Sequence, residues 1–274
     1  MIPEDHTYHN YRLPVPEEFE PVFSHFYYAE NNSSGPLTKT LLPSFQTIMV
    51  FNFGTKARLV SGAQNEIEVD KCIVLGPIKS AFDYTLPPGA QILVANFKGD
   101  AFYRFFGRAF LSGHLPVNPD EVMEENCFTY LWHQLNSITN TQDKADRILD
   151  FCRPYLRLQD STAALLANFK DDTLNPIKSV ADETGQTERN IQLMHKKHFG
   201  YSAKEVSRYQ RFIKAIGLIQ DILLSSKNID WFEIIATCGY YDQSQLIHDF
   251  KHFINLSPKN FVRFQQDICQ ASPE

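Results

Sequence analysis

The sequence predicts an α+β protein with a mostly-β N-terminal domain, a helical linker and an all-α C-terminal domain. Three observations lead to this prediction: short apolar runs that end at Gly or Pro, a helix-capping pattern near residue 118, and an internal repeat in the last third of the chain. A chain of 274 residues is long enough for about two hydrophobic cores. We expect the domains to span residues 1–112, 113–170 and 171–274.

The N-terminal part is predicted to be mostly β. Short runs rich in Val, Ile and Phe that end at Gly or Pro are typical of strands in a sandwich or barrel. Such runs occupy residues 46–53, 57–61, 66–75 and 91–97. A loop is expected at residues 31–36 and a turn at residues 86–89, where Pro, Gly, Asn and Ser cluster.

The linker is predicted to be helical. Asn118 followed by Pro119 resembles an N-cap with Pro at the first helical position, and helix-compatible sequence continues to about residue 137. Two further helices are expected at residues 141–157 and 161–170. One apolar face of this linker packs either within the chain or against a second copy of it. The residues at helical spacing on that face are Leu149, Cys152, Leu156 and Leu158.

Composition argues against several classes of protein. No window of about 18 uninterrupted apolar residues occurs, so we expect no membrane span. The first eleven residues lack the basic and then apolar order of a signal peptide. The five cysteines are scattered and never form a CxxC pair, which disfavours a disulfide framework and a zinc knuckle. A reducing cytoplasm is the expected location.

Charge places a condition on any role with nucleic acid. The formal net charge is −6 at pH 7, and residues 171–274 carry 12 basic against 13 acidic side chains. Nucleic-acid binding usually shows as a basic excess. Binding to DNA would therefore depend on where the individual charges lie.

The last third of the chain contains a degenerate repeat. The first copy has Gly185, then Thr187 as an N-cap and Gly200 as a helix end; the second has Gly239, Asp242 and Asn255 at the matching positions. Gly permits the left-handed conformation that ends a short helix, and Thr or Asp caps the next one. Short helix, tight turn and amphipathic second helix are the helix-turn-helix plan. A long helix over residues 203–224 is expected to connect the two copies.

This region resembles the AraC/XylS family of bacterial transcription regulators over residues 171–267. The most specific stretches are GYYDQSQL at 239–246, FK at 250–251 and LSPKNF at 256–261. The first copy departs from the family pattern at Leu193, His195 and Ala203, and the second at Ile235. Residues 87–107 are similar to the cupin-like sensory domain found in part of this family. The resemblance implies a regulator with two recognition helices in successive major-groove segments of double-stranded DNA.

Candidate DNA contacts follow from the exposed positions of the two second helices. Gln pairs bidentately with adenine, and Ser and His bond base edges. Candidates for base contact are Gln243, Ser244, Gln245 and His248 in the second copy, with Arg189, Gln192 and Leu193 in the first. Lys196, Lys197 and Lys251 lie farther along and suit phosphate contacts. The competing interpretation is a solvated helix face. His195 lies inward, which favours a hydrogen-bonded core histidine.

No enzyme is expected. The nucleotide-binding and hydrolase motifs GxGxxG, GxSxG and HExxH are absent, and no HxH metal-binding motif occurs. Cys72 is expected to be a small buried hydrophobe and not a nucleophile. No cofactor or metal is expected, and no ligand-binding residues can be named. The N-terminal domain either senses a small-molecule effector or only mediates homodimerisation. An activator, as opposed to a repressor, would also contact RNA polymerase. The alternative is a ligand-binding or enzymatic β-barrel protein with a helical interaction module.

Overall fold

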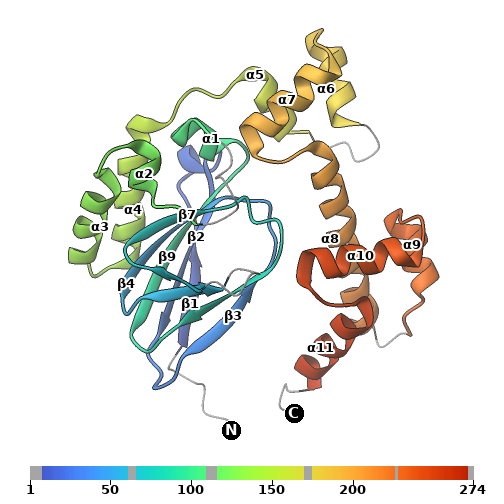
Figure 1. The fold of residues 1–274 in the computed structure, drawn as a ribbon, viewed down its shortest axis with the longest axis horizontal. Coiled ribbons are helices and arrows are strands. Elements are labelled where there is room, and N and C mark those ends of the chain that lie inside the picture. The colour runs from blue at the N-terminus through green and yellow to red at the C-terminus, as the bar shows by residue number, and fades with distance from the viewer. Residues whose placement is uncertain (1–7, 61–65, 109–115, 170–174, 226–227, 271–274) are drawn as a thin grey trace. The chain divides into compact units, whose positions relative to one another are not determined.

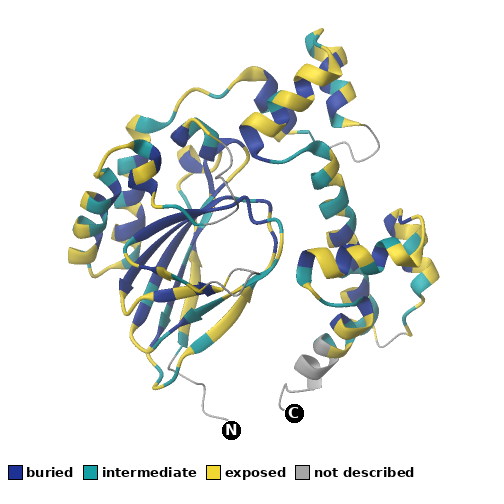
Figure 2. Cartoon of the chain, viewed as in Figure 1, coloured by how far each residue is buried: buried dark blue, intermediate teal, exposed yellow. Residues whose placement is uncertain are grey.

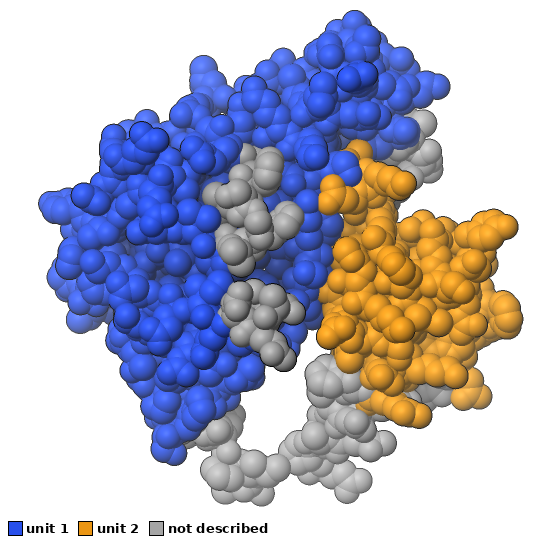
Figure 3. Space-filling model, viewed as in Figure 1, with its two compact units in different colours: residues 1–202 blue, residues 203–274 orange. Residues whose placement is uncertain are grey.

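The computed structural model describes residues 8–60, 66–108, 116–169, 175–225 and 228–270. Contacts divide the chain into two compact units, residues 1–202 and 203–274, which Figure 3 colours separately. The described strands all lie in the first unit. The expected domain boundaries, at 112/113 and 170/171, lie outside the described residues, so the three-domain division stays a prediction.

The first unit contains a five-stranded antiparallel sheet, here called sheet A (Figure 1). Its strand order is β1-β2-β9-β4-β7. The strands are β1 (Tyr8–Leu13), β2 (Phe23–Asn31), β4 (Ile48–Gly54), β7 (Cys72–Leu75) and β9 (Ala90–Phe97). The expected strands at 46–53 and 91–97 are therefore confirmed to within two residues.

A second, four-stranded antiparallel sheet, sheet B, has the order β3-β8-β5-β6. Its strands are β3 (Leu37–Leu41), β5 (Ala57–Val60), β6 (Glu66–Val69) and β8 (Phe82–Leu86). The prediction of one strand over 66–75 is wrong, because Asp70 and Lys71 separate β6 from β7, which lie in different sheets. The expected turn at 86–89 is confirmed: Gly89 has φ +77°, and the amide of Ala90 donates to the carbonyl of Pro87.

Sheet A is covered on both faces. One core lies between the sheets and includes Ile48, Val50 and Val94; another includes Met49 and Phe51 and lies against helices of the linker. Successive side chains of a strand point to opposite faces, so a central strand covered on both sides is apolar throughout. This explains the run IMVFNF in β4, every residue of which is buried (Figure 2).

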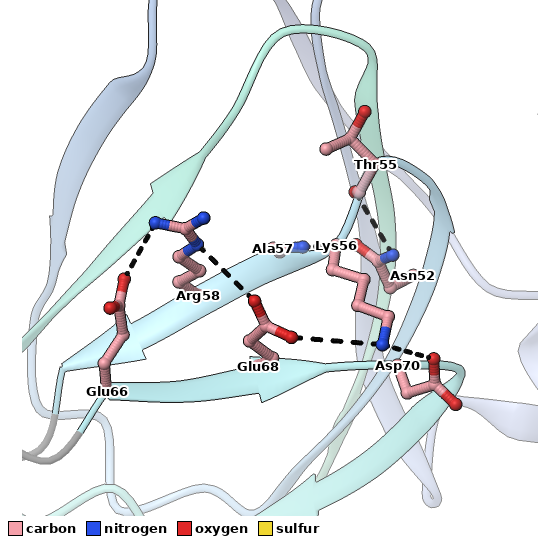
Figure 4. Close-up of polar contacts among 8 residues, drawn as sticks. All are labelled: Asn52, Thr55, Lys56, Ala57, Arg58, Glu66, Glu68 and Asp70. Atoms are coloured by element: carbon pink, nitrogen blue, oxygen red, sulfur yellow. Dashed lines mark hydrogen bonds and ion pairs between the residues drawn. The ribbon is translucent and has the colours of Figure 1, made fainter.

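Sheet B presents charged side chains to solvent along its β5–β6 edge (Figure 4). Arg58 lies 3.3 Å from Glu66 across the pair, and Lys56 lies 3.0 Å from Asp70. Charged residues along an edge strand discourage pairing with other chains. Below them, the buried Asn52 side chain accepts from the amide of Ala57 and so holds the turn into β5.

In the part of the first unit that the structure describes, five helices lie between the last strand and the helix pair described below. They are α1 (Ala101–Phe106), α2 (Pro119–Met123), α3 (Cys127–Ser137), α4 (Thr141–Cys152) and α5 (Ser161–Ala167). Asn118 caps α2 as expected, its side chain accepting from the amide of Asp120. The single helix expected over 119–137 is interrupted at Glu124, which has φ +58°. The Asp120 carboxylate then accepts from the amides of Phe128 and Thr129 and starts α3.

The apolar face of the linker packs largely within the chain. Leu149 and Cys152 are buried in the core beneath sheet A, and Leu156 packs against it partly buried. Leu158 is 97% exposed, because α4 ends at Cys152 and the helix expected to residue 157 does not continue. The intramolecular alternative is therefore observed for three of these four residues.

Candidate functional site

The first helix pair of the repeat consists of α6 (Pro176–Thr184) and α7 (Glu188–Phe199). Gly185 ends α6 with φ +66°, and the Thr187 side chain accepts from the amide of Asn190 to cap α7. Gly200, with φ +78°, ends α7. The caps and stops expected from the repeat are thus confirmed, and they place the turn between two short helices.

The outer face of α7 carries the residues proposed for contact with DNA. All five are exposed, and the Leu193 side chain is 60% exposed although it is apolar. They are Arg189, Gln192, Leu193, Lys196 and Lys197. The Lys197 ammonium lies 5.6 Å from the centre of the Tyr103 ring of α1, close enough for a cation–π contact.

The inner face of α7 fixes the helix in the first unit. Ile191 and Phe199 are buried, and so is His195, whose Nδ1 donates to the carbonyl of Tyr201 over 2.8 Å. The expectation of a hydrogen-bonded core histidine is confirmed. The ring centres of His198 and Tyr103 lie 4.1 Å apart, with the rings tilted by 35°, so α7 packs directly against α1.

The second helix pair lies in the other unit, after the long helix α8 (Ala203–Leu224). It consists of α9 (Trp231–Cys238) and α10 (Gln243–Ile254), followed by α11 (Pro258–Gln270). Gly239 ends α9 with φ +74°, and Asp242 caps α10 by accepting from the amide of Gln245 over 2.8 Å. Asn255, with φ +55°, ends α10. The sequence prediction of this pair is confirmed in each of these features.

The outer face of α10 presents Gln243, Ser244, His248 and Lys251, all exposed. Gln245 differs from them. Its side chain is half-buried, and its Oε1 accepts from the amide of Tyr241 over 2.9 Å. This bond and the Asp242 cap satisfy two amides at the start of α10 in the manner of a capping box. Gln245 therefore has a local structural role that sequence analysis missed.

A charged cluster joins α8 to α10. Asp249 is 1% exposed; its Oδ1 accepts from Nε of Arg208, and its Oδ2 lies 3.6 Å from Nη2 of Arg211. Nη2 of Arg208 also contacts Nδ1 of His248 at 2.9 Å. Neither arginine was predicted from the sequence. The available signal was an aspartate beside the apolar Phe250 on an inward helix face, which calls for a cationic partner.

These residues line a polar groove between α8 and α10, with a volume of about 700 Å³. Its cationic side chains are Lys204, Arg208 and Arg211, and Ser244 and His248 lie at its α10 side. Since Asp242 and Asp249 also line the groove, its three cations leave an excess of one positive charge beside the outer face of α10, although the chain as a whole is acidic.

A separate cavity of about 420 Å³ lies between sheets A and B. Ligand sites in proteins usually fall between 300 and 1,000 Å³ and are mostly apolar with a few polar groups. The apolar lining includes Ile48, Val50, Leu59, Ile92 and Val94. Because these residues come from strands far apart in the sequence, periodicity alone did not reveal the cavity.

The polar lining of this cavity comes from β1, β2, β3, β8 and β9 and from the β3–β4 connection. The strand residues are Arg12, His25, Tyr27, Thr40, Tyr84 and Asn96. Burial lowers the pKa of His25 below its usual value near 6.5, and the charge of Arg12 lowers it further. Burial raises the pKa of Tyr27 to about 12, so both side chains are neutral at pH 7 and offer hydrogen bonds.

Cysteine and metal chemistry find little support in the described part of the chain. Burial raises the pKa of the Cys72 thiol well above its usual value, which confirms Cys72 as a buried hydrophobe. Among the described residues, no group of three His, Cys, Asp or Glu side chains could hold a metal ion. Within the same residues, no helix is long and apolar enough to cross a bilayer.

Comparison with known proteins gives only distant likenesses. No family model and no curated protein matches the chain. A structure of ToxT from Vibrio cholerae is 16% identical, covers 94% of this chain and 98% of its own, and has a TM-score of 0.40. A ToxT structure with a bound unsaturated fatty acid is 12% identical, with coverages of 85% and 96% and a TM-score of 0.33.

The AraC-like transcriptional activator CuxR is a further similar structure. It is 10% identical, covers 97% of this chain and 87% of its own, and has a TM-score of 0.23. At TM-scores below 0.5, none of these likenesses establishes what the chain does.

Proposed function

We propose that the chain is a sequence-specific DNA-binding transcription regulator of the AraC/XylS type. One observation carries the proposal: two helix pairs, each with a left-handed glycine turn and a side-chain N-cap, present second helices with buried inner faces and mostly polar, exposed outer faces. That is the form of a helix-turn-helix unit, in which the second helix enters the major groove. In this proposal α7 and α10 are the recognition helices and occupy successive major-groove segments.

The distribution of charge supports the same proposal. The acidic net charge of −6 opposes nonspecific attraction to phosphate. The exposed outer faces nevertheless carry Arg189, Lys196 and Lys197 on α7, and Lys251 on α10. We assign the three lysines to phosphate contacts and Arg189 to base contact, with Gln192 and Leu193 beside it.

Selection from genomic DNA fragments tests this function. The purified full chain is incubated with the fragments at moderate salt, and enriched sequences are titrated with wild type and Gln243→Ala. Gln220→Ala, an exposed glutamine of α8, is the matched control. We expect a discrete enriched site that Gln243→Ala binds about tenfold less selectively, with the control unchanged. Equal binding of all fragments, with and without small molecules, would refute the proposal.

The cavity between the sheets supports a second part of the proposal, an effector site. Its apolar walls and polar lining fit a small molecule with an apolar body and a hydrogen-bonding group. A ligand at 100 times its dissociation constant stabilises the folded chain by about 2.7 kcal/mol. A thermal-shift screen of such molecules should find one that raises Tm in wild type and fails in Val94→Trp, which fills the cavity.

The remaining partners follow from this function. We propose a homodimer, contact with RNA polymerase in the case of an activator, and a cytoplasmic location, since the four cysteines that the structure describes are free. Sedimentation of the full chain with and without its selected DNA measures the oligomeric state. If the chain sedimented only as a monomer on a site with a single pair of half-sites, the homodimer would be excluded.

A further inference from the structure

His248 is the exposed side chain of α10 whose ring is held by a residue from another helix. Nη2 of Arg208, on α8, lies 2.9 Å from its Nδ1. The Arg208 guanidinium therefore engages Nδ1 from the groove, and Nε2 is the ring nitrogen that remains to contact a DNA base.

Arg208 is itself fixed by the buried Asp249. Nε of Arg208 donates to Oδ1 of Asp249, and the guanidinium lies 5.4 Å from the centre of the Phe253 ring. Asp249 is 1% exposed and the Arg208 side chain is 29% exposed. A guanidinium is planar, so a bond at Nε restricts where Nη2 can point. The buried carboxylate thus aims Nη2 at His248.

The direction of the Arg208–His248 bond follows from donor chemistry. A guanidinium has five N–H donors and no acceptor. Nδ1 of His248 must therefore accept, and in a neutral imidazole the proton then resides on Nε2. The exposed edge of His248 is consequently a donor.

We propose that Arg208 is a positioning residue that fixes the Nε2–H tautomer of His248, so that His248 reads guanine. This inference rests on the proposed function. In the major groove guanine presents two acceptors, N7 and O6, and no donor, whereas cytosine presents the N4 donor. Adenine presents a donor beside its N7, and thymine presents one acceptor, O4, beside a methyl group. Only guanine offers two adjacent acceptors and no donor, so it matches a single outward donor on His248 best.

The first test measures the tautomer without DNA. The full chain is labelled with nitrogen-15 in its histidines, and the His248 signal is assigned by its loss in His248→Gln. Long-range proton–nitrogen correlation spectra should place the proton on Nε2. In Arg208→Lys the compact ammonium can neutralise Asp249, but it lacks the planar set of N–H donors that lets a guanidinium bond Asp249 and His248 at the same time. This variant should show a mixture of the two tautomers.

The second test measures base preference. A library of random duplexes is selected with wild type, His248→Ala and Arg208→Lys. The base pair whose preference His248→Ala abolishes should be guanine-specific in wild type, by about tenfold. Arg208→Lys should weaken that preference and leave the other positions unchanged. His248→Gln should shift it toward adenine, which pairs bidentately with a glutamine amide.

A control covers the case in which Arg208→Lys fails to fold. Replacing Arg208, Arg211 and Asp249 together by Met removes the buried charge cluster as a unit, which is often neutral or stabilising. This triple variant should also lose the single tautomer and the guanine preference.

Three outcomes would overturn the inference. They are a proton on Nδ1 in wild type, an unchanged tautomer in both Arg208 variants, and a preference for any base other than guanine at the position read by His248. If wild type selected no sequence, the proposed function and the guanine assignment would both fail, while the spectra would still decide the role of Arg208. A fixed Nε2–H tautomer with no selected sequence would thus separate the two failures.

Discussion

At the scale of single residues, the buried carboxylate of Asp249 faces two guanidinium groups. Arg208 bonds one oxygen, and Arg211 lies beside the other. A charge removed from water is tolerated only when an opposite charge and hydrogen bonds replace its solvation. The packing of α8 against α10 therefore depends on all three charges being present together.

We expect Asp249→Ala to lower the free energy of unfolding by about 3 kcal/mol, because it leaves two partly buried guanidinium groups without their carboxylate. Asp221→Ala, an exposed aspartate on α8, is the control and should change it by less than about 0.5 kcal/mol. Urea unfolding followed by circular dichroism measures both. Similar values for the two variants would contradict the structural role of Asp249.

His25 makes stability depend on pH. Burial, with the charge of Arg12, lowers its pKa in the folded chain below the usual value near 6.5. Above that value the ring is neutral in both the folded and the unfolded chain. As the pH falls below it, the unfolded chain takes up a proton first, so the free energy of unfolding declines until His25 is also protonated in the folded chain.

His25→Gln should therefore flatten the loss of stability as pH falls below about 6.5. Urea midpoints measured from pH 7.5 to pH 5 would show this as a smaller slope than in wild type. The exposed His9→Gln serves as the comparison and should retain the wild-type slope. An identical slope in wild type and His25→Gln would rule out this contribution.

At the scale of elements, the helix pairs depend on glycines with a left-handed backbone. Gly239 ends α9 with φ +74°, and a Cβ built there meets no atom within 4 Å. Any cost of a side chain at this position therefore comes from the backbone alone. Gly217, inside α8, also leaves open space for a Cβ but has no left-handed φ.

The same substitution should thus have opposite effects at these two sites. Gly239→Ala should destabilise by about 1–2 kcal/mol, because an L-residue is strained in the left-handed region. Gly217→Ala should stabilise by about 0.8–1 kcal/mol, because alanine has the higher helix propensity. Thermal unfolding of both variants decides the point. An increase in stability in Gly239→Ala would show that the turn does not need a left-handed residue.

At the scale of the whole molecule, the proposed DNA binding by an acidic chain requires a few well-placed cations. Each phosphate neutralised contributes a slope of about −0.9 to the dependence of log affinity on log salt. Base contacts carry selectivity but release no counterion. Salt dependence can therefore separate the two kinds of contact on α10.

We expect Lys251→Ala to weaken binding equally at all sequences and to reduce the salt slope by about 0.9. Gln243→Ala should reduce selectivity and leave the slope unchanged. Titrations of the selected site and of a scrambled duplex at four salt concentrations measure both quantities. Loss of selectivity with an unchanged slope in Lys251→Ala would reassign this lysine to base contact.

Sequence reasoning was most successful where structure is local. The caps at Asn118, Thr187 and Asp242 and the helix stops at Gly185 and Gly239 were all predicted, because each depends on residues within one helical turn. Prediction from the sequence was least successful for the strands, of which β1 was missed. The β1 segment YHNYRL is polar and mostly exposed, so it lacks the apolar alternation by which strands are recognised.

The candidate site divides in the same way. The exposed positions of α7 and α10 followed from helix periodicity within the repeat. The capping bond of Gln245 to Tyr241, the pairing of Arg208 with His248, and the cavity between the sheets did not. The Arg208–His248 pairing and the cavity bring together side chains that are distant in the sequence. Many other pairings of such residues are equally compatible with the sequence, so periodicity does not select the observed ones.

The sequence by itself determined the α+β class, the two capped helix pairs and the polar outer faces proposed to meet DNA. These depend on backbone conformation, capping and periodicity, which act over a few residues. Only the tertiary structure decided that β6 and β7 belong to different sheets, that the sheets enclose a cavity, and that Asp249 aims Arg208 at His248. Their physical cause is packing and charge compensation between segments that meet only in the folded chain.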